Sequence, residues 1–301
     1  MPDNPTKVFA DHRELLFSIV YNMLGSVADT EDVLQEAWLS WASRDQSRIE
    51  NPRAYLVRIA VNQALAQQSA LRRRREAYVG PWLPEPLVAS AGDVADGSEE
   101  VLRAESVSMA MLVVLETLSP LERAVFILHE VFAYAHTEIA DMIDRSPSAV
   151  RQLAHRARGH VQARRPRHHV DPRVQRQVTE RFVAAAFGGD LDALMEMLAP
   201  QVTLWSDGGG RSNVASPRPV KGRATRSPGS SSPAPPNRPR ASTSSTGTST
   251  ATRPRWSFAR NAPFAVMVVD LTPDGEQVRD IYVVSNPDKL SRIPEGPERS
   301  G

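Results

Sequence analysis

Apolar residues recur at helical spacing throughout residues 8–75. In the first stretch, four of them fall at i, i+4, i+7 and i+8 and predict one buried stripe: Leu16, Val20, Met23 and Leu24. Gly25 ends this helix, and a second helix is predicted from about Asp29 to Ala42. Asn51-Pro52 is an N-cap with proline at the first helical position, so a third helix begins there. The pattern predicts an all-α domain over residues 5–76.

A linker containing proline and glycine separates these helices from the next ones. It spans residues 77–98 and includes Trp82-Leu83-Pro84-Glu85-Pro86-Leu87, which is too apolar for a solvated tether, so we expect it to dock on another part of the chain. Helices resume over residues 99–165, where Ser119-Pro120-Leu121-Glu122 forms a capping box. Two short helices follow, predicted at His136–Ile143 and Pro147–Val161, with Ser146 as a cap of the second.

The second short helix has two distinct faces. Five apolar residues at helical spacing predict its buried stripe: Val150, Leu153, Ala154, Ala157 and Val161. Polar side chains form the other stripe: Ser148, Arg151, Gln152, His155, Arg156 and Arg158. A short helix, a tight turn and a helix with such a face are typical of a helix-turn-helix, and Arg and Gln suit bidentate contacts with guanine and adenine. An ordinary helical hairpin with a solvated basic face is the alternative.

Strands appear among the helices after residue 172. Amphipathic helices are predicted at Val174–Phe187 and Leu191–Leu198. Strands are predicted at Val202–Trp205, Phe264–Leu271 and Val278–Val284. Helices followed by strands indicate a separate α+β domain over residues 172–290, with a tail at residues 291–301.

The segment Gly222–Pro263 interrupts this α+β domain. Thirty-eight of its 42 residues are Gly, Ala, Ser, Thr, Pro or Arg, so it cannot supply a core and is expected to be disordered. A disordered insertion and a compensated frameshift both explain it, because GC-rich codons read out of frame give this set of residues. No acid occurs from Gly208 to Val269, and we favour the frameshift. Translation of the other frames of the underlying DNA decides between them.

Charge is unevenly distributed, although the net charge is only +1. Glu14–Ala42 holds five acids and no base, whereas Arg145–Arg173 holds eight arginines against the single Asp171. An acidic and a basic patch indicate a protein partner for the first and a polyanion for the second. The absence of cysteine excludes disulfides, thiol nucleophiles and cysteine-ligated metals. Without a membrane-spanning run or a signal peptide, the sequence predicts a cytoplasmic protein with no membrane partner.

These residues resemble the extracytoplasmic-function sigma factors of the sigma-70 family, and more narrowly the subgroup with a SnoaL-like C-terminal domain. Asp29–Trp38 resembles region 2.2, Asn51–Asn62 resembles regions 2.3–2.4, and Val150–Arg158 resembles region 4.2. Three further segments match marks of the subgroup: Trp82–Leu87, Asp207–Arg211 and Asn286–Leu290. The resemblance covers nearly the whole chain except Gly222–Pro263, and the order of all the motifs makes it specific.

The resemblance implies a multidomain fold, in which two all-α sigma domains precede an α+β domain. It also implies two partners, core RNA polymerase and promoter DNA. The region 2.2 helix would dock on the clamp helices of the β′ subunit, and the β flap is a second expected contact. The candidate clamp contacts are Asp29, Asp32, Gln35 and Glu36. Compensation of the helix dipole is the alternative for Asp29.

Promoter contacts follow from the same resemblance. The helix that begins at Pro52 would read the −10 element and hold unstacked bases through Tyr55, Arg58 and Asn62. Arg72, Arg73 and the two arginines after them would contact phosphate, unless they form a solvated basic helix end. The −35 element would be read by the polar stripe described above. Within it, Arg151 and Gln152 are the expected base readers, and Arg156 and Arg158 would hold the backbone.

The resemblance makes the C-terminal domain a built-in regulator that contacts the sigma core and the linker. The regulatory candidates are Trp82, Pro84, Glu85, Asp207, Gly208, Gly209, Gly210, Arg211, Asn286, Pro287, Asp288, Lys289 and Leu290. Asp207 beside three glycines could be a general base or cap a turn, and we favour the turn. No catalytic residue, metal or cofactor is predicted, His168-His169 being too isolated to imply one. A small ligand of this domain is left open.

The predicted function is promoter-specific initiation of transcription, with no enzymatic step. A helix-turn-helix repressor or activator is one alternative, but it would not need a polymerase-clamp helix. A SnoaL-type small-molecule enzyme fused to a DNA-binding module is the other. Such an enzyme would require convergent acid–base residues, which the sequence does not show.

Overall fold

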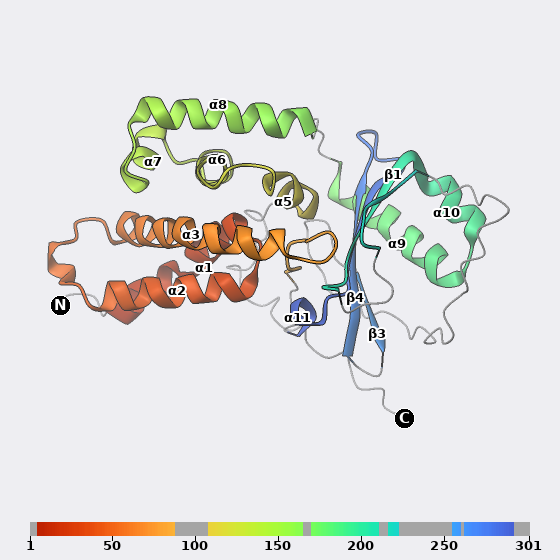
Figure 1. The fold of residues 1–301 in the computed structure, drawn as a ribbon, viewed down its shortest axis with the longest axis horizontal. Coiled ribbons are helices and arrows are strands. Elements are labelled where there is room, and N and C mark those ends of the chain that lie inside the picture. Colours follow the sequence, from red (N-terminus) through yellow and green to blue (C-terminus); the bar gives the residue numbers. More distant parts are fainter. Residues whose placement is uncertain are drawn as a thin grey trace. The chain divides into compact units, whose positions relative to one another are not determined.

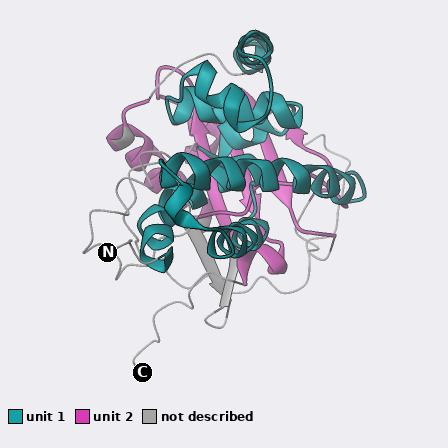
Figure 2. Ribbon diagram, turned by 90° about the vertical axis from the view of Figure 1, so that its left-hand side faces the viewer, with its two compact units in different colours: residues 1–77, 96–167 teal, residues 78–95, 168–301 magenta. Residues whose placement is uncertain are grey.

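A computed structural model describes residues 5–87, 108–164, 170–210, 216–222, 255–259 and 262–291. The chain divides into two compact units, the first made of residues 1–77 and 96–167 and the second of residues 78–95 and 168–301 (Figure 2). The apolar linker segment Tyr78–Leu87 belongs to the second unit. Residues 78–95 of unit 2 therefore lie, in the sequence, between the two parts of unit 1.

Unit 1 begins with three long helices that lie side by side (Figure 1). They are α1 Pro5–Leu24, α2 Val27–Ala42 and α3 Pro52–Glu76, with a 3-10 turn, η1 Gln46–Arg48, before α3. Ser26 caps α2 and Asn51 caps α3, and each side-chain oxygen accepts a hydrogen bond from the first turn. The predicted apolar stripe of α1 is fully buried, as expected.

The second half of unit 1 is also helical. Its described residues, 108–164, form α5 Met109–Leu115, α6 Pro120–Phe126, the π-helical turn η3 Ile127–Val131, α7 His136–Met142 and α8 Pro147–Arg164. The capping box is confirmed, because the side chains of Ser119 and Glu122 bond to each other's backbone N–H. The five apolar residues of the α8 stripe are buried and join the core of α1–α3 in one continuous cluster.

Side chains of other helices cap the C-terminal end of α1. Gln68 of α3 donates to the carbonyl oxygen of Met23 at 3.0 Å, and Arg123 of α6 donates to that of Asn22 at 3.0 Å. The last carbonyl groups of a helix lack intrahelical partners and carry partial negative charge. These bonds satisfy two of those groups in a place that water does not reach.

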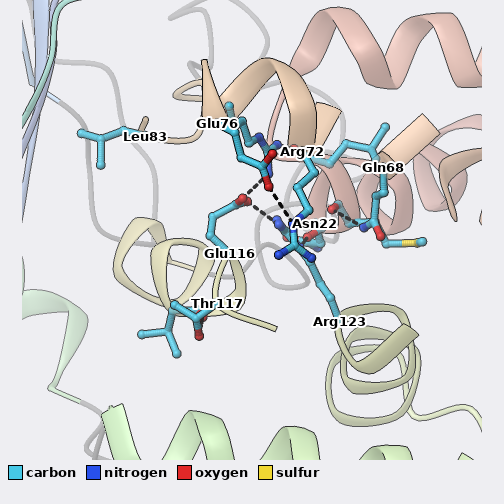
Figure 3. Close-up of polar contacts among 12 residues, drawn as sticks. Asn22, Gln68, Arg72, Glu76, Leu83, Glu116, Thr117 and Arg123 are labelled. Carbon is cyan, nitrogen blue, oxygen red and sulfur yellow. Dashed lines mark hydrogen bonds and ion pairs between the residues drawn. The ribbon is translucent and has the colours of Figure 1, made fainter. Parts of the chain in front are cut away.

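Arg75 completes this cap and links it to an ion-pair network. Its guanidinium donates to the carbonyl oxygen of Leu24 and pairs with Glu116. The carboxylate of Glu116 also accepts a hydrogen bond from Arg123 (Figure 3). Burial lowers the pKa of Arg75 to about 10, although Glu116 acts in the opposite direction. The expectation of a phosphate contact is therefore wrong for Arg75, because its side chain is turned into the protein.

In the described residues, unit 2 combines a mixed five-stranded sheet with three helices. The strands are β1 Leu198–Asp207, β2 Val220–Lys221, β3 Arg255–Ala259, β4 Ala262–Leu271 and β5 Val278–Val284. Their order is β2-β1-β5-β4-β3, with β1 parallel to β5 and every other pair antiparallel. The helices are α9 Pro172–Gly188, α10 Leu191–Met197 and the short α11 Pro287–Leu290.

The core of unit 2 lies between α9, α10 and the sheet. Val269 and Ile281 are direct cross-strand partners on β4 and β5, and both pack in this core with Val178 and Phe182 of α9. Successive side chains of a strand point to opposite faces, so every second residue of each strand reaches the helices. The fold thus has the predicted sequence of classes, helices first and then an α+β domain.

The strand β3 departs from the sequence analysis. It lies inside Gly222–Pro263, which was expected to be disordered throughout, and it pairs with β4. That expectation is wrong for residues 255–259, where Trp256 and Phe258 alternate with small residues as strands prefer. The β4 strand also begins at Ala262 rather than Phe264. Residues 223–254 lie outside the described part of the chain.

Candidate functional site

The α2 helix presents an exposed polar stripe to solvent. Asp32, Gln35 and Glu36 are all exposed. Leu39 follows one turn later on the same face, and it is 52% exposed. The stripe is therefore mostly polar and acidic, with one exposed apolar side chain. The sequence analysis missed Leu39, although its i+7 spacing from Asp32 would have placed it on this face.

Asp29 does not belong to this stripe. Its side chain is buried, and its Oδ1 accepts a hydrogen bond from Arg74 at 2.8 Å and from Gln67 at 3.3 Å. The expectation that the region 2.2 helix exposes Asp29 is therefore wrong, whereas its contact with a partner stays a prediction. A cation from the end of α3 pairs with it at the start of α2.

The α3 helix carries the candidates for the −10 element in three different environments. Tyr55 is half-buried, with its ring 6.0 Å from that of Trp41, whereas Arg58 is exposed. Asn62 donates through Nδ2 to the carbonyl oxygen of Met142 in α7 at 2.7 Å. At the end of the helix, Arg72 pairs with Glu76 at 3.3 Å, and Arg73 is exposed. These five residues share one helix. Four of them are exposed, and Tyr55 is half-buried.

A cavity of about 540 Å³ lies between α3 and α7. Tyr55 and Arg58 line it from α3, and Tyr134, Glu138 and Asp141 line it from α7 and the turn before it. Aromatic rings and guanidinium groups at one surface suit unstacked bases and phosphate. The acids of α7 give the opposite wall a negative charge, so a nucleic acid would favour the α3 side.

The helix-turn-helix forms as the sequence predicts. Ser146 Oγ accepts a hydrogen bond from Ala149 N at 3.2 Å and caps α8, and Asp144 takes φ 52° in the turn. A left-handed backbone is tolerated best by Gly, Asn and Asp. The residues Ser148, Arg151, Gln152 and His155 are exposed on α8. They form one accessible polar stripe opposite the buried one.

The two arginines expected to hold the DNA backbone are engaged in ion pairs. Arg156 lies 3.1 Å from Glu122, although its side chain is 61% exposed, and Arg158 pairs with Glu130. Burial alone would raise the pKa of Glu122, but hydrogen bonds from Ser119, together with Arg156, hold it below its ordinary value. Each arginine thus already has an acidic partner within unit 1.

The regulatory candidates of unit 2 converge on the carboxylate of Asp207. This residue is fully buried at the end of β1. Its Oδ2 accepts from Leu83 N at 2.9 Å and from Lys289 Nζ at 2.7 Å. Its Oδ1 accepts from the hydroxyl of Tyr78 and from Gly209 N at 3.2 Å. Three segments that are far apart in the sequence are therefore joined by one side chain.

Further contacts reinforce this Asp207 cluster. Lys289 Nζ lies 4.0 Å from the centroid of the Trp82 ring, and Asn286 Nδ2 donates to Tyr78 at 2.7 Å. Burial and the hydrogen bond to Asp207 raise the pKa of Tyr78. Gly209 has φ 61°, and a Cβ there would lie 2.7 Å from Asn286 Cγ, so glycine is required. Capping of the turn is confirmed, since Asp207 accepts from Gly209 N.

The remaining candidates surround the same cluster. Pro84 and Glu85 are buried in the linker segment, Gly208 is buried, and Gly210 is exposed. Asn286 caps α11, because its side-chain oxygen accepts a hydrogen bond from Asp288 N, and Pro287 is the first residue of this helix. Leu290 is buried. Arg211 and His168-His169 lie outside the described residues. Among the described residues, no group of acids and histidines could hold a metal ion, and no helix is long and apolar enough to cross a membrane.

Two family matches define the class of this protein. Residues 8–76 match sigma-70 region 2, and residues 108–161 match sigma-70 region 4. The chain belongs to the extracytoplasmic-function (ECF) sigma factors of the sigma-70 family.

Its relatives include two proteins of Mycobacterium tuberculosis. The chain is 41% identical over 204 residues to the ECF RNA polymerase sigma factor SigJ, covering 67% of this chain and 65% of that protein. It is 35% identical over 193 residues to the probable ECF RNA polymerase sigma factor SigI, covering 64% of this chain and 66% of that protein. The matched part therefore spans slightly less than two thirds of each relative.

A solved structure extends the likeness to unit 2. The crystal structure of M. tuberculosis SigJ aligns with a TM-score of 0.71 at 29% identity, covering 97% of this chain and 100% of that one. The mixed sheet after the helical regions is thus shared with that protein.

Proposed function

We propose that this protein binds core RNA polymerase and directs promoter-specific initiation of transcription. The observation that carries the proposal is the accessible stripe of Arg151 and Gln152 on α8 in a chain that matches sigma-70 regions 2 and 4 in order. Arg and Gln read guanine and adenine edges in the major groove. We assign the −35 element to this stripe and the −10 element to Tyr55, Arg58 and Asn62.

The exposed stripe of α2 is the proposed contact with the polymerase clamp. We assign Asp32, Gln35 and Glu36 to it and add Leu39, whose exposed apolar surface would be buried in the complex. Asp32 and Glu36 give this surface of α2 a negative charge, and Leu39 adds apolar area that the complex would bury. The two alternatives are weaker, because neither a repressor nor a fused enzyme needs this stripe.

Run-off transcription with purified core polymerase tests the proposal on the full chain. Wild type should give promoter-dependent transcripts, and Arg151→Ala should weaken binding to the −35 element by about 1–3 kcal/mol and relax its sequence preference. Arg181→Ala, at an exposed arginine of α9, is the matched control. If no transcript forms and the wild type does not bind core polymerase, the sigma function is excluded. If Arg151→Ala weakens binding to all DNA sequences equally, Arg151 contacts phosphate instead of a base.

The Asp207 cluster supports a second element of the proposal, modulation of sigma activity in cis by unit 2. It fixes the segment Tyr78–Leu87, which connects the two matched sigma regions in the sequence. Lys289→Met should loosen this segment and change the yield of transcripts, whereas Lys221→Met, at an exposed lysine of β2, should not. Equal yields from both variants would leave unit 2 without a role in regulation.

A further inference from the structure

Two histidine rings lie in contact, tilted against each other, where the chain enters the helix-turn-helix. The ring centroids of His129 and His136 lie 4.1 Å apart, with 30° between the ring planes. His129 belongs to η3, and His136 is the first residue of α7. This ring contact therefore ties the π-helical turn to the first helix of the pair, and α7 packs against α8, the proposed DNA-binding helix.

The turn between the two rings is tightly wound. Phe132 N donates to the carbonyl oxygen of Ile127 at 3.2 Å, and Ala133 has φ 56°, a left-handed backbone that alanine rarely adopts. Such a conformation persists only where its surroundings hold it. Here the Nδ1 atom of His129 lies 2.9 Å from the carbonyl oxygen of Tyr134, within hydrogen-bonding distance. The His129 ring thus supports the turn and also contacts the ring of His136.

The surroundings of His136 disfavour a proton on its ring. Its Nε2 atom is buried and has no hydrogen-bond partner among the described residues. The groups that act on it are His129 and Glu130 of η3 and Arg151 and Arg158 of α8. Burial, with His129 and the two arginines, lowers the pKa of His136 below its ordinary value, although Glu130 opposes this. Since Glu130 already pairs with Arg158, a protonated His136 would add charge beside two arginines and a second imidazole.

We propose that the contacting pair of His129 and His136 makes DNA binding by the helix-turn-helix sensitive to pH, because the neutral pair positions α7 against α8 and protonation releases it. His136 is a positioning residue in this proposal and touches no DNA. The proposal rests on the proposed function, since α8 must bind promoter DNA. The folded pKa of His136 lies below the unfolded value of 6.5, so the stability it contributes is present above that value and is lost as pH falls.

The test compares the wild-type chain with His136→Phe, which keeps an aromatic ring but cannot titrate. Binding to a −35 DNA fragment is measured from about pH 7.5 to about pH 5.5 at constant ionic strength, where histidine changes charge. Wild-type affinity should fall about five-fold over this range, and the loss should disappear in His136→Phe. His12→Gln, at a histidine of α1, should behave as wild type. In parallel, the imidazole NMR signals of His136 are followed against pH.

The two measurements separate the outcomes. If His136→Phe keeps the same pH dependence as wild type, or if the His136 signals titrate at the ordinary value, the proposal is overturned. If neither the wild type nor any variant binds the fragment at any pH, the DNA-binding function itself fails, and the NMR titration still decides whether His136 resists protonation. His136→Tyr provides a second aromatic replacement in case the phenylalanine variant does not fold.

Discussion

Units 1 and 2 both contain buried charges, but the charges hold different kinds of structure. In unit 1, Glu116 pairs with Arg75 and Arg123 across helices that already share a continuous apolar core. In unit 2, Asp207 receives four donors and fixes a linker segment that has no regular secondary structure. The loss of Glu116 should therefore weaken the contact between helices that remain packed in unit 1. The loss of Asp207 should release the whole segment Tyr78–Leu87 in unit 2.

Removal of the central carboxylate of unit 2 should have the largest effect. Asp207→Ala leaves Lys289 buried without its counter-ion and removes the acceptor of Leu83 N, so we expect a loss of about 3–5 kcal/mol. Denaturant unfolding followed by tryptophan fluorescence measures it, because Trp82 lies against Lys289. Glu196→Ala, at an exposed position of α10, is the control. A loss below about 1 kcal/mol would mean that apolar packing alone holds the segment.

Neutralising the shared acid of unit 1 should cost less, because the apolar core remains. Glu116→Gln leaves two guanidinium groups with a weaker acceptor, and we expect a loss of about 2–4 kcal/mol. The measurement is the free energy of unfolding of the full chain, with Glu14→Gln at an exposed position of α1 as the control. A double-mutant cycle with Arg75→Met isolates the pair. Additive losses in that cycle would show that Glu116 and Arg75 are not coupled.

Glu122 should make a smaller contribution that depends on pH. Its folded pKa is held below the unfolded value, so its stabilisation is present above the unfolded pKa and is lost as pH falls through the folded pKa. Glu122→Gln should therefore cost about 1–2 kcal/mol near neutral pH, and this difference should shrink below about pH 4. Unfolding curves at several pH values measure the difference. A constant difference at all pH values would assign the cost to the lost capping geometry alone.

Local signals in the sequence predicted the helices of both units well. Asn51-Pro52, the capping box at Ser119 and the stripe of α8 act within a few residues, and each lies where it was expected. Strands at β4 and β5 were predicted as well, because both segments are rich in β-branched and aromatic residues, but the mixed order of the sheet was not. The strand β3 was not predicted either, since its pairing with β4 depends on main-chain hydrogen bonds that composition does not report.

The errors in the candidate sites have a common physical cause. Asp29 and Arg75 were expected at the surface, but each meets a partner more than 40 positions away in the sequence. A charge pattern shows which side chains are available, whereas tertiary packing decides which of them are neutralised internally. The three segments around Asp207 were identified as motifs, but their meeting at one carboxylate required the fold.

The smallest predicted effects separate two acids of the same helix, one used inside unit 1 and one available to a partner. Asp29→Asn weakens a pair whose arginine is largely exposed, so it should cost about 0.5–1 kcal/mol of stability. Asp32→Asn should leave stability unchanged within about 0.5 kcal/mol and weaken binding to core polymerase, because Asp32 is exposed beside Leu39. Unfolding and a binding titration with core polymerase measure both variants. If Asp29→Asn weakens polymerase binding more than Asp32→Asn does, the exposed stripe of α2 is not the docking surface, and the buried acid acts through the position of α2.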